Sequence, residues 1–225
     1  MTPDLSASAS LAPSLFDPEA LAIVLAGTLL ATVARAGLRD CLLAGRSALE
    51  LIRRGFDEDA NRTALARLAG VAKRKGLRAM DGPMPPDPAL ANAVDQLMRT
   101  ASLDALRDNF EQAQAEQTTR AMRAAHVFEM AGEAAPIFGL VGTLFAMTEI
   151  APMGGGGDAS ATTFAAIATA VISSLYGVLA AHMICLPVSG AITRRGERDG
   201  QARAALVAWL ANEVSVRRRP LERVA

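Results

Sequence analysis

Apolar residues gather into three runs along the chain, and polar segments separate them. The first run lies within 18–38, the second covers 134–153 and the third covers 163–192. A helix of about 20 residues crosses the hydrocarbon core of a bilayer. Each run therefore predicts a transmembrane helix.

The segment 39–133 between the first two runs is predicted to be helical, because Ala, Leu, Arg, Glu and Gln dominate it and β-branched and aromatic residues are sparse. Helix breaks are predicted at 55–59, at Gly76 and at 81–86. Asp87 followed by Pro88 has the pattern of an N-cap and a first helical residue.

The last helix of this segment begins near Ser102 or Asp104 and meets no strong breaker before Pro136. Two interpretations follow from this pattern. The helix either continues unbroken into the second apolar run or kinks near Gly132.

Basic residues divide the chain into four zones. Lys and Arg are absent from 1–34 and from 136–192, whereas 35–135 contains fifteen and 193–225 contains eight. Short loops rich in Lys and Arg remain in the cytoplasm. The charge pattern therefore orients all three predicted helices.

The resulting topology places the N-terminal tail 1–17 and the Gly-rich loop 154–162 in the periplasm, and the segment 39–133 and the C-terminal tail 193–225 in the cytoplasm. The predicted fold is an all-α integral membrane protein with three transmembrane helices and a helical cytoplasmic domain inserted between the first and second. A cleavable signal peptide is the alternative for the first run, but acids and no bases precede it.

The composition excludes several other classes of protein. The formal net charge is zero, with 23 basic and 23 acidic residues, which argues against a polybasic nucleic-acid binder. Cys41 and Cys185 are too few for a disulfide framework or a thiolate metal site. His126 and His182 are isolated, and the glycines at 154–157 lack the strand and helix of a phosphate loop. We therefore expect neither an enzyme nor a bound cofactor.

Small and hydroxyl residues recur at intervals of four in the last two runs. The series in the third run starts at Ala165 and includes Ser173, Gly177 and Ala181, and the series in the second includes Gly139. Such series let membrane helices pack closely. The glycines at 139, 142 and 177 are accordingly predicted to pack helices.

Three hydroxyls, Thr143, Ser173 and Ser174, fall near the middle of the second and third runs. They could line an ion path, but proton relays in membranes use carboxylates or histidines. Glu149 and His182 do not share the hydroxyl level. We therefore expect the central titrating group to come from another polypeptide.

The residues of the last two runs resemble the MotA/TolQ/ExbB proton-channel family. The motifs are APIFGLVGTL at 135–144, AVISSLYGVLAA at 170–181 and Leu186-Pro187. Within the family, the resemblance is closest to the flagellar stator branch, MotA, which is also similar at 22–28 and at 72–90.

The resemblance implies a pentamer around a dimer of a single-span subunit of MotB, TolR or ExbD type, whose membrane aspartate carries the proton. Thr143, Ser173 and Ser174 would face that aspartate. Pro136 and Pro187 match the prolines at the cytoplasmic ends of the two helices, where they would permit bending.

Lys73 and Asp81 fall where MotA carries an Arg and a Glu that engage the rotor ring. Ordinary solvated surface charge is the alternative for both residues. MotA also has four spans with its N-terminus inside, so the resemblance implies that the first of these spans is lost or replaced by a partner, or that the sequence starts late.

The predicted function is an ion-conducting stator-type subunit in the bacterial inner membrane, in contact with lipid and not with nucleic acid, that couples proton flow to torque on the flagellar rotor. A TolQ/ExbB-like energiser of a periplasm-spanning system is the alternative within the family. A non-conducting membrane scaffold is the alternative of another class. We expect H⁺ to be the transported ion, with Na⁺ as the alternative, since hydroxyl-lined paths occur for both.

Overall fold

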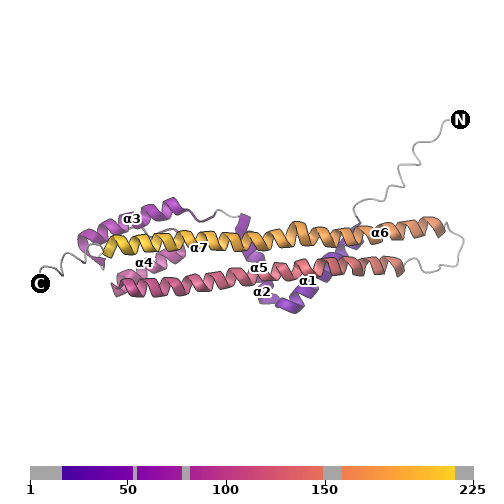
Figure 1. Cartoon of the computed structure of the whole chain (residues 1–225), viewed down its shortest axis with the longest axis horizontal. Helices are drawn as coiled ribbons and strands as arrows, with labels where there is room; N and C mark the ends of the chain where they lie inside the picture. The colour runs from indigo at the N-terminus through magenta and orange to yellow at the C-terminus, as the bar shows by residue number, and fades with distance from the viewer. Residues whose placement is uncertain (1–16, 53–54, 78–81, 149–158, 216–225) are drawn as a thin grey trace, which may run out of the picture. The chain divides into compact units, whose positions relative to one another are not determined.

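We describe the protein from a computed structural model, which covers residues 17–52, 55–77, 82–148 and 159–215, with the backbone alone for 159–162. The described residues are helical and contain no strand (Figure 1). In chain order, the helices are α1 (Pro18–Ala36), α2 (Leu38–Ile52), α3 (Glu58–Lys75), α4 (Pro88–Thr100), α5 (Leu103–Thr148), α6 (Ala159–Leu179), the π-helical segment η2 (Ala180–Cys185) and α7 (Leu186–Ser215).

Three helical stretches among the described residues are long and apolar enough to cross a membrane: Pro18–Ala36, Leu103–Thr148 and Thr163–Ser215. The predicted fold class, an all-α membrane protein with three spanning helices, is therefore confirmed. The helix before Pro136 continues unbroken into the second apolar run, which is the first of the two interpretations given above. With 46 residues, α5 extends about 69 Å, and Pro136 lies inside it.

The first apolar helix is shorter than predicted. It ends at Ala36, because Gly37 has a φ of 84° and its N–H donates to the carbonyl of Val33 at 2.8 Å. Positive φ is readily adopted by glycine alone. The chain turns there, and α2 begins at Leu38.

The chain divides into two compact units, which we describe separately. The first consists of Met1–Arg46 and Ala124–Gly190, and the second of Ser47–Arg123 and Ala191–Ala225. The helices α5 and α7 contribute residues to both units.

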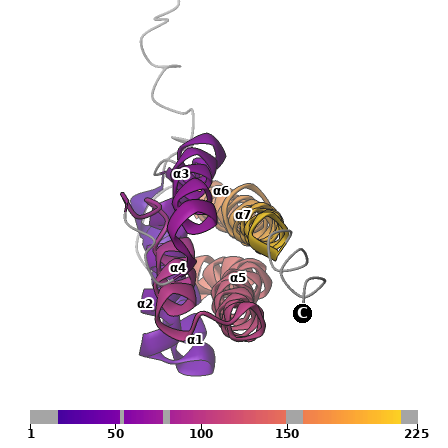
Figure 2. The same cartoon turned by 90° about the vertical axis from the view of Figure 1, so that its left-hand side faces the viewer.

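In the first unit, α5 and α6 run side by side (Figures 1 and 2), and their backbones approach each other closely at Gly139 and Gly177. A Cβ atom added to Gly177 would lie 2.5 Å from the carbonyl oxygen of Ala135 and 3.1 Å from Cα of Gly139. A Cβ atom on Gly139 would lie 3.1 Å from the carbonyl oxygen of Ser173. Only glycine fits at such an approach, which is how membrane helices gain dispersion contact without help from water.

The small residues of α6 do not follow the predicted interval of four over its whole length. Ala165 is exposed, whereas Ala166 and Ala170 are buried. An α-helix has 3.6 residues per turn, so a series at intervals of four drifts around it. The buried small residues of α6 instead follow one another at steps of three and four residues.

The helix α1 crosses α5 and α6 obliquely. The backbone N–H of Asp17 donates to Tyr176 Oη at 2.9 Å, and Arg35 Nη1 lies 3.5 Å from Glu133 Oε2. The two contacts hold the start of α1 against α6 and its end against α5. The start of α1 thus meets α6 near the middle of the predicted third span, where Tyr176 offers an acceptor to an N–H of the helix start.

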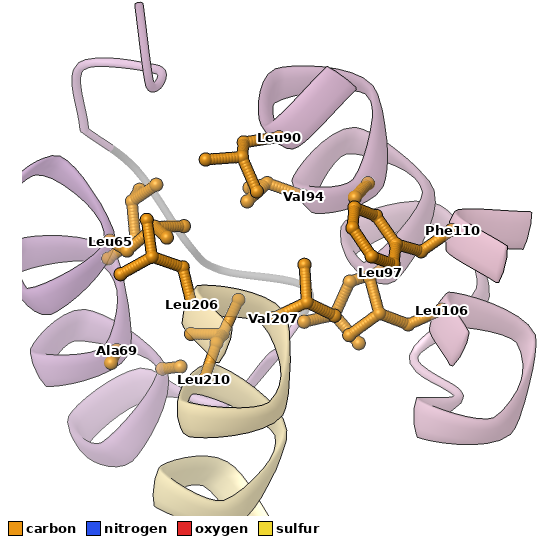
Figure 3. Packing of buried hydrophobic residues seen from close by; sticks show 13 residues of the cluster. Leu65, Ala69, Leu90, Val94, Leu97, Leu106, Phe110, Leu206, Val207 and Leu210 are labelled. Atoms are coloured by element: carbon orange, nitrogen blue, oxygen red, sulfur yellow. The ribbon is translucent and has the colours of Figure 1, made fainter. Parts of the chain in front are cut away.

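The core of the second unit lies between α3, α4, α5 and α7 (Figure 3). Buried residues of α4 recur at steps of three and four, the period of a helix with one apolar face. Segment 193–225, described above as a tail, is helical through Ser215 and contributes to this core. The cluster comprises Leu65, Leu68, Ala69, Ala72, Leu90, Ala93, Val94, Leu97, Leu106, Phe110, Leu206, Val207 and Leu210.

A polar clamp joins these helices beside the core. Asp87 is the N-cap of α4, as predicted with Pro88 behind it, and its Oδ1 accepts from the N–H groups of Ala89 and Leu90. Its Oδ2 accepts from Arg203 Nε at 2.9 Å and Nη2 at 2.8 Å. The Arg203 guanidinium also stacks on Phe56, 5.1 Å from the ring centroid. One carboxylate therefore caps α4 and ties it to α7.

We expect Arg203→Ala to destabilise the second unit by about 3 kcal/mol, because it leaves the buried Asp87 carboxylate without its cation. Thermal unfolding of the purified protein, followed by fluorescence of Trp209, measures this, since the single tryptophan packs against the core. Arg198→Ala is the control, because that side chain is 78% exposed. Equal unfolding midpoints for the two variants would contradict the clamp.

We expect Gly177→Ala to destabilise the first unit by about 3 kcal/mol, because a methyl group cannot fit against the backbone of α5. The measurement is the yield and thermal midpoint of the detergent-purified protein. Gly45→Ala is the matched control, since a Cβ atom at Gly45 meets nothing within 4 Å. If both variants were purified with wild-type yield and midpoint, the close approach would be wrong.

Candidate ion pathway

The three predicted hydroxyls lie on adjoining helices in the first unit, but their surroundings differ. Thr143, on α5, is partly exposed and donates its hydroxyl to the carbonyl of Leu140 at 2.6 Å. Ser174, on α6, is also partly exposed. Both keep a side that another helix, water or an ion can reach.

Ser173 is enclosed within the chain itself. Its exposed fraction is 0%, and its Oγ donates to the carbonyl of Gly139 at 3.1 Å. A Cβ atom added to Gly142 would collide with this hydroxyl. Ser173 therefore fixes the two helices to each other, and all three predicted packing glycines, at 139, 142 and 177, lie at this contact.

The two predicted helix-end prolines occupy different settings. Pro136 lies inside the continuous helix α5, beside Gly177. Pro187 follows the π-helical segment η2 by two residues, and it is exposed. A proline lacks the N–H for an i→i−4 bond and clashes with the carbonyl there, so a widened turn immediately before it accommodates the ring.

Hydrogen bonds in η2 have the longer reach of a π-helix. The N–H of Leu186 donates to the carbonyl of Ala181, five residues back, and His182 Nδ1 lies 3.1 Å from the carbonyl oxygen of Val178. Wide turns of this kind are frequent at functional sites. The side chain of His182 is exposed, and its alternative role as a packing or interface residue stays a prediction.

A polar cluster that sequence reasoning missed joins α5, two to three turns before Pro136, to the first turn of α7. Ser189 Oγ donates to Glu129 Oε1 at 3.1 Å, and His126 Nδ1 lies 3.3 Å from Glu129 Oε2. Ser189 is buried, with 4% exposed. The spacing of Glu129 and Glu133, four residues apart just before the second apolar run, is the signal that could have found it.

The start of α1 is bonded to the middle of α6. The N–H of Asp17 donates to Tyr176 Oη, and Tyr176 follows Ser174 by two residues on α6. Asp17 Oδ1 accepts from the N–H groups of Glu19 and Ala20, so the side chain caps α1. Glu149 lies outside the described residues.

Of the two predicted rotor-contact residues, the structure describes one. Lys73, in the last turn of α3, forms an ion pair with Glu213 of α7, and the two side chains are 41% and 38% exposed. Asp81 lies outside the described residues. Lys73 thus has a partner within its own unit and still presents part of its side chain to solvent.

Neither a metal site nor a redox pair is evident among the residues that the structure describes. They contain no group of three or more His, Cys, Asp or Glu side chains that could hold an ion. Cys41 and Cys185 are both free thiols. The chemistry available in the first unit is that of hydroxyls, helix-end carbonyls and a few carboxylates.

The fold is similar to that of two flagellar stator complexes. The structure of C. jejuni MotAB matches with a TM-score of 0.78 and 17% sequence identity, over 89% of this chain and 79% of that one. The flagellar MotAB stator complex from Bacillus subtilis matches with a TM-score of 0.75 and 20% identity, over the same shares. No curated protein matches the sequence.

The sequence also matches the model of a protein family. The match covers residues 83–204, more than half of the chain, and includes α4, the whole of α5 and α6, and most of α7. The matched range includes Thr143, Ser173 and Ser174. The chain belongs to the MotA/TolQ/ExbB proton channel family.

Proposed function

We propose that the chain is the ion-conducting subunit of a stator that couples proton flow across the bacterial inner membrane to torque on the flagellar rotor. The observation that carries the proposal is the partial exposure of the Thr143 and Ser174 hydroxyls on adjoining helices. Both hydroxyls keep an accessible side on two helices whose backbones are locked together by Ser173 and Gly177.

A neutral hydroxyl stabilises a passing ion but does not carry a proton alone. The carrier in this proposal is a membrane aspartate on a single-span partner of MotB type, in line with the MotAB complexes that share the fold. When that aspartate takes up or releases a proton, its bond to the hydroxyls changes. The bending points at Pro136 and Pro187 would let the inner helix ends respond.

A homo-oligomer, a pentamer by family resemblance, would surround the partner. The outer parts of α5 and α6 present large apolar side chains that this chain leaves uncovered, as expected of helices that meet lipid and other subunits. They include Leu140, Leu144, Phe145, Phe164, Val171 and Leu175. In the proposed orientation, the N-terminus is periplasmic and the C-terminus cytoplasmic.

Torque would leave the chain through the second unit. Helix α7 begins directly after η2 and ends at Ser215. Near its end, Glu213 forms the ion pair with Lys73. Lys73 and Asp81 are the proposed rotor contacts. An exposed ion pair stabilises a fold by at most about 1 kcal/mol, so the role of Lys73 can be tested apart from folding.

Thr143→Val combined with Ser174→Ala should lower ion flux through the complex by roughly a hundredfold or more. Each hydroxyl that bonds a charged group contributes about 1.5–3 kcal/mol, and 1.36 kcal/mol is tenfold in rate. Flux is measured in vesicles that contain the chain with its partner subunit, in proton gradients with and without Na⁺, which also identifies the ion.

Ser173→Ala is the control for this measurement. Its hydroxyl serves the packing of α5 on α6, so we expect a lower thermal midpoint and a flux per assembled complex near that of the wild type. Wild-type flux in the Thr143→Val and Ser174→Ala double variant would remove the conducting role and favour a scaffold.

We expect the charge swap of Lys73→Glu with Glu213→Lys to preserve folding but impair torque, because it restores the internal ion pair and reverses the charges offered to a rotor. The measurement is the rotation speed of tethered cells that carry the variant and its partner, with the amount of assembled complex as reference. Arg74→Glu, at the next position of α3, is the matched control.

Full rotation in the swapped variant would show that Lys73 serves its pair with Glu213 alone. If the variant also conducted ions normally, a TolQ/ExbB-like energiser would be the better assignment. Failure of the flux prediction and failure of the torque prediction are therefore distinguishable.

A further inference from the structure

His182 carries an ionisable side chain inside the third apolar run. It lies in η2, between Ala181 and Met183, and its side chain is exposed. Ionisable residues within membrane helices almost always face the interior of a bundle or a water-filled cavity, because contact with hydrocarbon is costly. We therefore expect the imidazole to face the interior of the assembled complex.

The ring of His182 is held in one tautomer. Its Nδ1 lies 3.1 Å from the carbonyl oxygen of Val178. A carbonyl oxygen only accepts, so Nδ1 carries the hydrogen of this bond and Nε2 of the neutral ring keeps a lone pair. Histidine is also the side chain that most readily changes its charge between pH 5 and 8. The imidazole is thus oriented to accept a proton at Nε2.

In the proposed orientation, His182 lies on the cytoplasmic side of the level of Thr143 and Ser174. It follows Ser174 by eight residues, which corresponds to about 12 Å along a helix and about 80° around it. The wider turn of η2 makes this angle smaller. Ser174 and His182 therefore project from the same side of α6 and η2.

A second titratable site lies further toward the cytoplasm on α5. Glu129 precedes Thr143 by fourteen residues, about 21 Å along the helix and about 40° around it. Ser189 Oγ donates to Glu129 Oε1 at 3.1 Å, which places this carboxylate beside the first turn of α7. Its other oxygen lies 3.3 Å from His126 Nδ1, and the side chains of His126 and Glu129 are 67% and 51% exposed. Water therefore reaches this pair.

We propose that His182 and the Glu129–His126 pair carry the proton from the hydroxyl level to the cytoplasm. This relay rests on the proposed function and names the residues that complete its ion path. The protonated carboxyl of the partner subunit gives its proton, through water, to Nε2 of His182, and the ring becomes an imidazolium. Nε2 then releases the proton, again through water, to the Glu129 carboxylate, which passes it to the cytoplasm. The ring and Glu129 return to their first state, the partner's carboxyl is left as a carboxylate, and nothing is oxidised or reduced.

Water takes part in both transfers because the groups are separated along the helices. Direct transfer requires two atoms within about 2.6–3.2 Å of each other. The interval is about 12 Å from Ser174 to His182 and about 10 Å from His182 to Ser189. Chains of Asp, Glu and His at such intervals mark proton relays in membrane pumps and transporters.

Paired substitutions at His182 separate proton transfer from packing. The Gln amide can donate to the Val178 carbonyl as the imidazole does, but it holds no transferable proton, whereas Glu holds one. We expect His182→Gln to lower proton flux by about a hundredfold, as for the loss of an acid–base group, and His182→Glu to conduct better than His182→Gln. Flux per assembled complex is measured in vesicles that contain the chain with its partner subunit. Met183→Ala, at the next exposed position of η2, is the matched control.

Three results would overturn the relay. Wild-type flux in His182→Gln would show that the imidazole carries no proton. Equal losses in His182→Gln and His182→Glu would show that it serves packing. Flux of Na⁺ in place of H⁺ through the wild-type complex would exclude the relay and leave the proposed stator function intact, whereas a wild-type complex that conducts no ion would contradict both together.

Glu129→Gln tests the second site. Its amide oxygen still accepts from Ser189, so we expect an unchanged thermal midpoint. Proton flux should fall by about tenfold, less than for His182→Gln, because water also reaches this exposed site. Glu116→Gln, the same substitution at another exposed position of α5, is the matched control. Wild-type flux in Glu129→Gln would overturn the part of Glu129 in the relay.

Discussion

At Gly177 the backbone of α6 touches the backbone of α5, and the rest of the first unit depends on that contact. It allows Ser173 to donate to the carbonyl of Gly139, and it fixes where Thr143 and Ser174 point. Since lipid is as apolar as leucine, no hydrophobic force holds two membrane helices together. Close packing and the buried hydrogen bond from Ser173 to Gly139 do this instead, so the candidate ion path is positioned by residues that do not line it.

Much of the fold could be predicted because its signals are local. The three apolar runs and the separation of charges specify the number of spanning helices. The Asp87-Pro88 pair specifies where α4 starts. The helical core segment of α7 also carries a local signal, since Leu206, Val207 and Leu210 recur at helical spacing in the second unit. That spacing was available in the sequence, although the charged residues around it favour reading the segment as a tail.

The candidate site was harder to predict, because it depends on which side of a helix faces a neighbour. Ser173 and Ser174 are adjacent in sequence but about 100° apart around α6, so one is buried and the other is partly exposed. Asp17 meets Tyr176, and Ser189 meets Glu129, across 159 and 60 residues respectively. The spacing of apolar residues in a single sequence does not reveal which residues meet across such separations. The oblique path of α1 follows from the same long-range contacts.

The π turn of η2 has a consequence for how the last long helix tolerates change. Ser173, Gly177, Ala181 and Ser189 are all buried although they are separated by multiples of four residues, a spacing that would drift around a regular α-helix. The wide turn absorbs that drift by holding an extra residue. The rotational phase of α6 and that of α7 are thus set separately, and Ala180–Cys185 is the place where evolution can add or remove a residue without turning either helix away from its neighbour.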